Sequence, residues 1–113
     1  MIKIYHNPRC KKSREGLKYL EEKGLEFEIV DYIKESLSVD ELSKLIDMTG
    51  LQPEELVRKQ EEDYKKNYKG KSFSKEEWVK ILVENPKLLQ RPIVVNESKA
   101  VWAQPPDNIA KII

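Results

Sequence analysis

The first thirty residues alternate between apolar and polar positions in a way that predicts a strand, a helix and a second strand. Residues 2–5 are rich in β-prone side chains and are followed by the breaker Asn7-Pro8. Residues 11–23 suit a helix because leucines recur one turn apart, and Gly24 is placed to cap its C-terminal end. From residue 25 to residue 30 the alternation has a period of two, which is typical of a strand. The chain therefore opens as β-α-β, and the second strand is expected to run close beside the first.

The middle of the chain has the pattern of helices. Ser38 and Ser74 are each followed three residues later by a glutamate, which is the form of a capping box, and an apolar stripe follows each of them. The first of these helices is expected to end near Gly50. In the second, Phe73 precedes the cap and is placed to pack against Trp78. Two amphipathic helices are therefore predicted here.

The stretch between these two helices carries weaker signals. Pro53 suits the first turn of a further helix that carries Leu56 and Val57. Residues 61–71 are mostly charged, and we interpret them as a solvated loop or a frayed helix end.

Two short β-prone stretches near the end of the chain predict a hairpin. Residues 93–95 form the first stretch, residues 96–98 have turn character, and residues 100–102 form the second stretch. Pro105-Pro106 then interrupts the pattern, and three isoleucines within 109–113 indicate a short terminal helix.

The chain has 113 residues, which fits one domain and leaves little room for a second. The predicted elements give an α/β fold in the order β-α-β, three helices, β-β-α. We therefore expect residues 1–113 to form a single domain with a helical insertion at about residues 36–88.

Charge and hydropathy exclude several classes of protein. Lysine and arginine number 21 and acidic residues 20, so the net charge is +1, and both signs are spread along the chain. This balance is not typical of a general nucleic-acid binder, so any anion site must be local. No apolar run approaches the roughly 20 residues that span a bilayer, and the first residues lack the apolar core of a signal peptide. We expect a cytoplasmic monomer with no nucleic-acid or membrane partner.

Cys10 is the only cysteine of the chain and His6 the only histidine. This composition excludes an intramolecular disulfide and a Cys-rich zinc site, and we predict neither a metal nor a bound cofactor. A lone cysteine can be a small buried hydrophobe, but Cys10 directly precedes the predicted helix, whose N-terminus favours the reactive thiolate. Four basic residues lie around it in the sequence: Arg9, Lys11, Lys12 and Arg14. These surroundings make Cys10 the candidate nucleophile.

The same helix N-terminus suits an oxyanion such as phosphate or arsenate, because backbone N–H groups and the helix dipole both face the incoming negative charge. Ser13 either donates its hydroxyl to the sulfur of Cys10 across one helical turn or bonds to the backbone. His6 either assists thiolate formation or orients the loop. Arg58 and Arg91 belong to this site only if the fold brings them to Cys10, and are otherwise surface charges.

Three stretches taken together resemble the glutaredoxin-coupled ArsC-type arsenate reductase family. They are Ile-Tyr-His-Asn-Pro-Arg-Cys-Lys-Lys-Ser-Arg at residues 4–14, Leu-Val-Arg-Lys at residues 56–59, and Leu-Leu-Gln-Arg-Pro-Ile-Val-Val at residues 88–95. The order of elements agrees with that family along essentially the whole chain. No one of the three stretches is specific alone, but their occurrence in this order is.

The resemblance implies a thioredoxin-like fold with a helical insertion and a nucleophilic Cys10. It also implies that Arg58 and Arg91 support the bound oxyanion. The peptide bond between Arg91 and Pro92 is expected to be cis, with the proline facing the active cysteine. We assign supporting positions to His6, Asn7, Ser13 and Pro92.

One position departs from the family pattern. Arsenate reductases of this family carry a third active-site arginine before the proline that follows the last strand, and here that position is Gln104. Glutamine can form a hydrogen bond with an oxyanion but brings no charge, so it is expected to hold arsenate less strongly.

The predicted function is a thiol-dependent reductase resembling arsenate reductase, with arsenate, another small oxyanion or a disulfide as substrate. Because Cys10 has no partner cysteine, the resolving thiol must be external, which favours glutathione followed by glutaredoxin. One alternative is a glutathione-dependent thiol reductase that does not act on arsenate. Another is a protein-binding regulator similar to the Spx-type regulators that bind RNA polymerase, working without a disulfide switch because Ser13 stands where the second cysteine of Cys-x-x-Cys would be.

Overall fold

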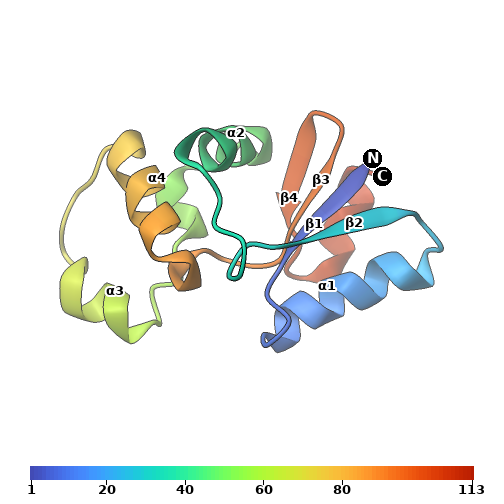
Figure 1. The fold of residues 1–113 in the computed structure, drawn as a ribbon, viewed down its shortest axis with the longest axis horizontal. Helices are drawn as coiled ribbons and strands as arrows, with labels where there is room; N and C mark the ends of the chain where they lie inside the picture. The colour runs from blue at the N-terminus through green and yellow to red at the C-terminus, as the bar shows by residue number, and fades with distance from the viewer.

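A four-stranded sheet and a group of helices make up the computed structural model, which describes residues 1–113 (Figure 1). The helices and strands are β1 (Ile2–His6), α1 (Lys11–Glu22), β2 (Phe27–Asp31), α2 (Val39–Thr49), α3 (Glu62–Asn67), α4 (Lys75–Glu84), β3 (Ile93–Asn96) and β4 (Lys99–Trp102). Three short 3-10 turns complete the order: η1 (Pro53–Leu56), η2 (Pro86–Leu88) and η3 (Pro106–Lys111). The α/β class and the β-α-β opening predicted from the sequence are confirmed.

The sheet has the strand order β2-β1-β3-β4, with β1 parallel to β2 and antiparallel to β3. His6 pairs with Asp31 of β2, and Tyr5 pairs with Ile93 of β3. Ile93 in turn pairs with Trp102 of β4, which completes the predicted hairpin. The carboxyl ends of β1, β2 and β4 and the amino end of β3 therefore meet at one edge of the sheet, which we call the site edge.

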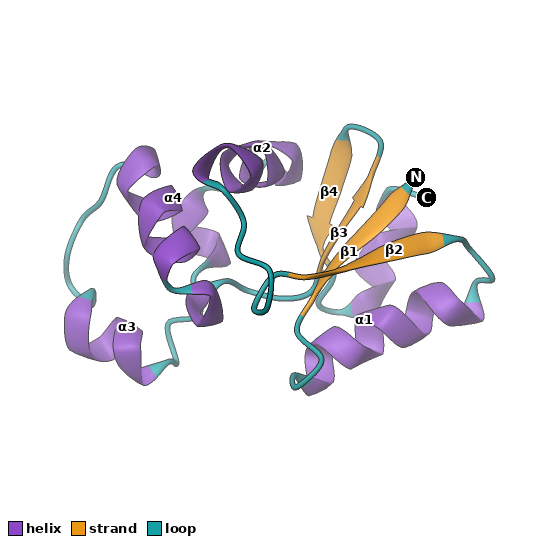
Figure 2. Cartoon of the chain, viewed as in Figure 1, coloured by secondary structure: helices purple, strands orange, loops and turns teal.

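The two faces of the sheet are covered by different parts of the chain. Ile4 and Val94 point to the face that α1 and η3 cover, where they form a cluster with Leu20 and Ile109. Side chains of β3 and β4 on the other face join a larger cluster with the helices between β2 and β3. Figure 2 shows those helices gathered to one side of the sheet, with α2 nearest to β4. The site edge thus lies where the sheet meets the helical part of the chain.

Both predicted capping boxes are present. The hydroxyl of Ser38 accepts from the backbone N–H of Glu41, and the hydroxyl of Ser74 accepts from that of Glu77. Phe73 packs edge-on against Trp78 with ring centroids 4.9 Å apart, as the spacing predicted. Local signals at helix starts therefore translate directly into structure here.

The interpretation of residues 61–71 as a loop or frayed end is wrong. They contain the helix α3, and the ring of Tyr64 is buried in the larger cluster, with 8% of its surface exposed. The charges of α3 follow the helix dipole, with Glu62 and Asp63 in its first turn and two lysines in its last. Tyr64 is the only buried residue of this otherwise polar helix. One apolar position cannot produce the helical periodicity of apolar residues from which a helix is predicted.

Two further predictions need correction. The helix expected to start at Pro53 is only the 3-10 turn η1, and Val57 lies outside it in an isolated β-bridge with Leu89. The terminal helix is the 3-10 turn η3, which buries Ile109 and leaves Ile113 exposed beyond its end. None of the helices combines the length and the apolar character that a span of the bilayer requires.

Candidate active site

Cys10 lies at the site edge, at the N-cap position of α1. The loop that follows β1 is held by two hydrogen bonds to Asn7: the N–H of Cys10 donates to its carbonyl at 3.0 Å, and the N–H of Arg9 donates to its side-chain oxygen at 3.1 Å. Cys10 has extended backbone angles and its side chain caps no helix N–H group. The thiol is therefore partly exposed at the N-terminus of a twelve-residue helix.

Ser13 links the loop to the first turn of α1. Its hydroxyl accepts the backbone N–H of Asn7 at 2.9 Å and lies 2.7 Å from Nδ1 of His6. Burial lowers the pKa of His6; the charge of Asp31 and the Ser13 contact oppose this shift, while the charge of Arg14 adds to it. The neutral ring that results can accept a hydrogen bond from the Ser13 hydroxyl at Nδ1. Because this hydroxyl also accepts from the backbone N–H of Asn7, Ser13 has the predicted contact with the backbone and not the one with the sulfur of Cys10.

The thiol of Cys10 is influenced by opposing effects. Burial raises its pKa, but the side chain of Arg91, the nearby backbone N–H groups of Ser13 and Lys12, and the charge of Arg91 together outweigh burial, so the pKa is lowered overall. A thiol with a lowered pKa carries more thiolate at neutral pH, and the thiolate is the nucleophilic form. A lowered pKa at a helix N-terminus is typical of reactive cysteines, so Cys10 is kept as the candidate nucleophile.

Arg91 and Pro92 enter the site edge at the start of β3. One terminal nitrogen of Arg91 donates to the carbonyl of Lys87 at 3.0 Å, whereas its Nε–H is buried without a partner. The peptide bond between Arg91 and Pro92 is cis, as the resemblance implied. Pro92 is buried against Gly16, whose missing side chain lets α1 lie directly over the proline. These contacts bring Arg91 to Cys10.

Arg58 is held close to the same segment. Its backbone N–H donates to the carbonyl of Leu88 at 2.6 Å, beside the bridge between Val57 and Leu89. Its side chain is largely buried and pairs through Nε with Glu61 at 3.2 Å. The guanidinium of Arg58 is engaged by a carboxylate, whereas that of Arg91 acts on the thiol and lowers its pKa.

Gln104 also lies at the site edge, because the N–H of the preceding Ala103 donates to the carbonyl of Pro92 at 2.9 Å. The side-chain oxygen of Gln104 is buried and has no hydrogen-bond partner. The peptide bond that follows it, to Pro105, is cis as well, which the sequence did not indicate.

Two residues near the site were missed by sequence reasoning. Tyr32 directly follows β2 and its ring is buried, with a hydroxyl that interacts with the charges of Arg91, Cys10 and Arg58. Glu61 is the counter-ion of Arg58. A tyrosine after a strand and a glutamate in a charged run are both common, so only the fold identifies them.

A cleft of about 410 Å³ opens beside the Cys10 loop. The loop lines one side of it, and the chain after β2 and the turn η2 line the others; the lining residues are Asn7, Pro8, Arg9, Asp31, Ile33, Lys34 and Lys87. Three of them are cationic and one is acidic. Elsewhere, no group of three or more histidine, cysteine or acidic side chains is placed to hold a metal ion.

Comparison with known proteins assigns a family to this arrangement. Residues 5–112 match the model of the ArsC family. An arsenate reductase of Haemophilus influenzae is 38% identical over 112 residues, covering 97% of each chain, and an uncharacterised protein of Escherichia coli is 42% identical over 99% of this chain and 96% of its own. The solved structure of an arsenate reductase from Vibrio cholerae superposes with a TM-score of 0.94 at 38% identity, over 99% of this chain and 97% of that one. The α/β architecture is accordingly the thioredoxin-like fold, and the chain belongs to the ArsC family.

Proposed function

We propose that this protein is a thiol-dependent reductase of arsenate in which Cys10 is the nucleophile. The observation that supports this proposal best is the thiol at the N-terminus of α1 with its pKa lowered by Arg91 and two backbone N–H groups. Relatives described as arsenate reductases indicate the substrate.

In the proposed reaction, the Cys10 thiolate attacks arsenic. A sulfur–arsenic bond forms, one arsenic–oxygen bond breaks, and the oxygen leaves as water after taking up protons. Arg91 and the N–H groups of the first turn of α1 stabilise the oxyanion, with Arg58 as a second cation. Two external thiols then supply two electrons: As(V) becomes As(III), and the thiols leave as one disulfide. Water then cleaves the sulfur–arsenic bond, so that As(III) leaves as arsenite and Cys10 is released as a thiol.

We propose glutathione as the first external thiol and glutaredoxin as the protein that regenerates it. The chain contains no second cysteine that could resolve the adduct. The cleft beside the Cys10 loop has room for a small peptide, and its cations Arg9, Lys34 and Lys87 suit the carboxylates of glutathione. The acidic Asp31 suits its ammonium group.

The decisive experiment measures arsenate-dependent NADPH oxidation in a mixture of glutathione, glutaredoxin and glutathione reductase. Turnover is expected with the wild-type protein and is expected to vanish in Cys10→Ser, which removes the nucleophile and leaves the packed core intact. A circular-dichroism spectrum checks that the variant is folded. Turnover that persists in Cys10→Ser would remove Cys10 from the mechanism.

Gln104 favours a second candidate, a glutathione-dependent thiol reductase that acts on disulfides. Its side chain brings no charge to the site edge, whereas a disulfide substrate needs none. Under this candidate, Cys10 exchanges with glutathione disulfides but shows no arsenate turnover. Reactive Cys10 without turnover of either substrate would instead favour the protein-binding regulator.

The variant Gln104→Arg separates these candidates. If the missing charge limits arsenate binding, kcat/KM for arsenate should rise by about ten-fold or more, because a charge-assisted hydrogen bond replaces a neutral one. The rate of exchange with a glutathione mixed disulfide serves as the control and should change little. An unchanged kcat/KM for arsenate would show that charge at position 104 does not limit the reaction.

A further inference from the structure

Two buried hydrogen-bond donors near Cys10 have no acceptor in the protein. The hydroxyl of Tyr32 is one, in a side chain with 1% of its surface exposed, and Nε–H of Arg91 is the other. Buried polar groups are almost always paired, because leaving one unpaired costs free energy. Unpaired donors beside a candidate catalytic thiol therefore point to a ligand that presents an acceptor.

The sheet register places these donors on opposite sides of the Cys10 loop. His6 pairs with Asp31, so Tyr32 is level with Asn7 on the β2 side. Tyr5 pairs with Ile93, so Arg91 is level with Asn7 on the β3 side. Because β1 lies between β2 and β3, the loop that carries Cys10 leaves the sheet between the tyrosine and the arginine.

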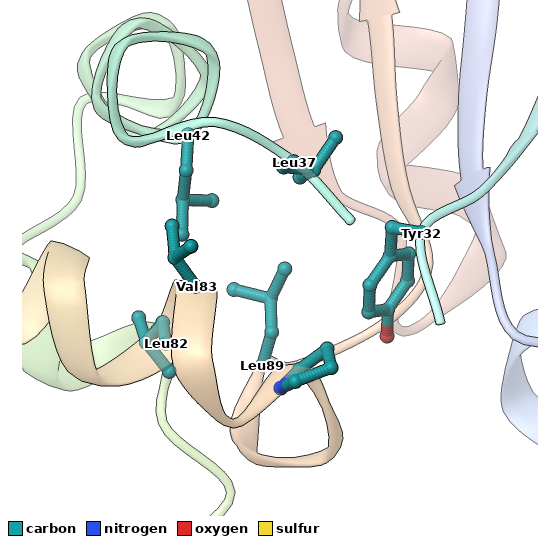
Figure 3. A pocket seen from close by; sticks show the side chains of 7 residues that line it. Tyr32, Leu37, Leu42, Leu82, Val83 and Leu89 are labelled. Carbon is teal, nitrogen blue, oxygen red and sulfur yellow. The ribbon is translucent and has the colours of Figure 1, made fainter. Parts of the chain in front are cut away.

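The ring of Tyr32 sits at the border of a small apolar pocket, and its hydroxyl does not face the leucines there. Figure 3 shows the hydroxyl oxygen at the end of the ring away from Leu37 and Leu42. Among the charges that act on this hydroxyl, that of Arg91 has the largest effect.

The hydroxyl keeps its proton under all physiological conditions. Burial raises the pKa of Tyr32 to about 12, with Arg91 and Arg58 opposing the shift and the charge of Cys10 adding to it. The groups that act on the hydroxyl are the groups of the candidate site. Tyr32 can therefore serve as a neutral donor but not as a general base at neutral pH.

We propose that the Tyr32 hydroxyl binds the oxyanion held at Cys10, donating to one of its oxygens while Nε–H of Arg91 donates to the same or a neighbouring oxygen. This inference rests on the proposed function, since it assigns a further binding residue to that site. Hydrogen bonds to a charged oxygen are stronger than those between neutral groups, so the contribution should be measurable.

The test compares wild-type protein with Tyr32→Phe, which removes only the hydroxyl. Alkylation of Cys10 by iodoacetamide is followed at increasing concentrations of arsenate, without any thiol, and each rate is divided by the same protein's rate without arsenate. The concentration that gives half-protection is expected to rise by about ten-fold or more in Tyr32→Phe. Tyr68→Phe is the matched control: Tyr68 packs against the same larger cluster as Tyr32 and its hydroxyl accepts from Asn85, so half-protection should stay within about two-fold of wild type.

Thermal unfolding supplies an independent readout. Because the Tyr32 hydroxyl has no partner in the protein, its removal should leave the Tm unchanged or raise it. A lowered Tm in Tyr32→Phe would show that the hydroxyl is paired within the protein and would overturn the inference.

The outcomes separate this inference from the proposed function. Equal half-protection of wild type and Tyr32→Phe would overturn the role of Tyr32 and leave Cys10 as the arsenate nucleophile. A wild-type protein that arsenate does not protect at any concentration would overturn both.

Discussion

At the residue scale, Arg91 is the side chain that does most to lower the pKa of the Cys10 thiol. It also donates to the backbone carbonyl of Lys87, and its Nε–H is buried without a partner in the protein. Arg58 shares its charge with Glu61. The two arginines therefore have different partners, which the sequence alone does not distinguish.

Arg91→Met tests this difference through the titration of Cys10. In wild type, the alkylation rate plotted against pH should have its midpoint below that of an ordinary thiol, because Arg91 stabilises the thiolate. In Arg91→Met the side chain that lowers the pKa of Cys10 is gone, whereas burial still raises it. The midpoint of the alkylation curve should therefore move to higher pH. The control Arg14→Met changes an exposed arginine that bonds only to the carbonyl of Pro8 and should move the midpoint little. An equal shift in both variants would contradict the specific role of Arg91.

His6 makes stability depend on pH. Burial lowers its pKa below the ordinary value of 6.5, so between these two values the unfolded chain binds more protons than the folded protein. The stability associated with His6 is full above pH 6.5 and is lost as the pH falls through the lowered value. Urea unfolding should therefore show a lower midpoint at pH 5.5 than at pH 7.5.

His6→Asn is the matched variant, because its side-chain oxygen can replace Nδ1 as the acceptor for Ser13 but does not titrate. The difference between the two pH values should shrink in this variant. An identical difference in both proteins would assign the pH dependence to other groups.

Several residues of the site could be predicted from the sequence because they lie in one short stretch with a helix start. Cys10, His6 and Ser13 are of this kind, and local hydrogen bonds place them. Tyr32 and Glu61 could not be predicted, since each reaches the site only through long-range packing.

At the scale of elements, the close contact between α1 and Pro92, the residue that precedes β3, sets how near the start of α1 lies to Arg91. Gly16 is the point of closest approach: a Cβ atom there would lie 2.6 Å from Cγ of Pro92. This contact is steric and tight, since protein interiors are packed at the density of crystals. The glycine has a negative φ within α1, so packing and not backbone conformation explains the residue.

Gly16→Ala should therefore destabilise the protein. An alanine in a helix gains about 1 kcal/mol over glycine in intrinsic propensity, but overpacking at a rigid proline costs about 1–3 kcal/mol. Urea unfolding should give a net loss of stability, and the Cys10 alkylation midpoint should shift because α1 and Arg91 are pushed apart. Glu15→Ala, at an exposed neighbouring position of α1, is the control and should be close to neutral. A higher free energy of unfolding in Gly16→Ala than in wild type would show that Pro92 moves aside at little cost and would contradict this prediction.

Elements with strong local signals were predicted well, and those without were not. Capping boxes located α2 and α4, and β-prone stretches, with a period of two for β2, located the strands, because these signals act within a few residues. The helix α3 was missed since one buried ring, Tyr64, holds it in place. The helix predicted to start at Pro53 is longer than η1, because Val57 forms a β-bridge with Leu89 and so cannot continue the turn.

At the scale of the whole molecule, the helical part and the sheet share one apolar cluster. Residues Ile93, Val95 and Ala100 of the sheet belong to the same cluster as Trp78 and the other buried side chains of the helices. The chain also crosses between the two parts at Leu88–Pro92, next to the site. We therefore expect the two parts to unfold together, as a single domain would.

The two tryptophans allow a direct test. Trp78 lies in α4 and Trp102 lies in β4, so Trp102→Phe leaves a fluorescent reporter in the helical part and Trp78→Phe leaves one in the sheet. In each variant the fluorescence transition in urea should coincide with that of the far-ultraviolet circular dichroism. If the fluorescence of Trp78 changes at a lower urea concentration than the circular dichroism, the helical part unfolds independently of the sheet.

Strand β2 leaves one row of backbone N–H and C=O groups free at the side of the sheet, since β1 is its only neighbour. Such a row can template the addition of strands from other copies. The strand is only five residues long, and Glu28 and Asp31 bring negative charge to it beside the exposed Ile29. Two copies pairing there would bring like charges together. These carboxylates should therefore keep concentrated solutions of the protein from aggregating through β2. Replacing Glu28 by valine removes one of them, so the time to visible turbidity should be shorter.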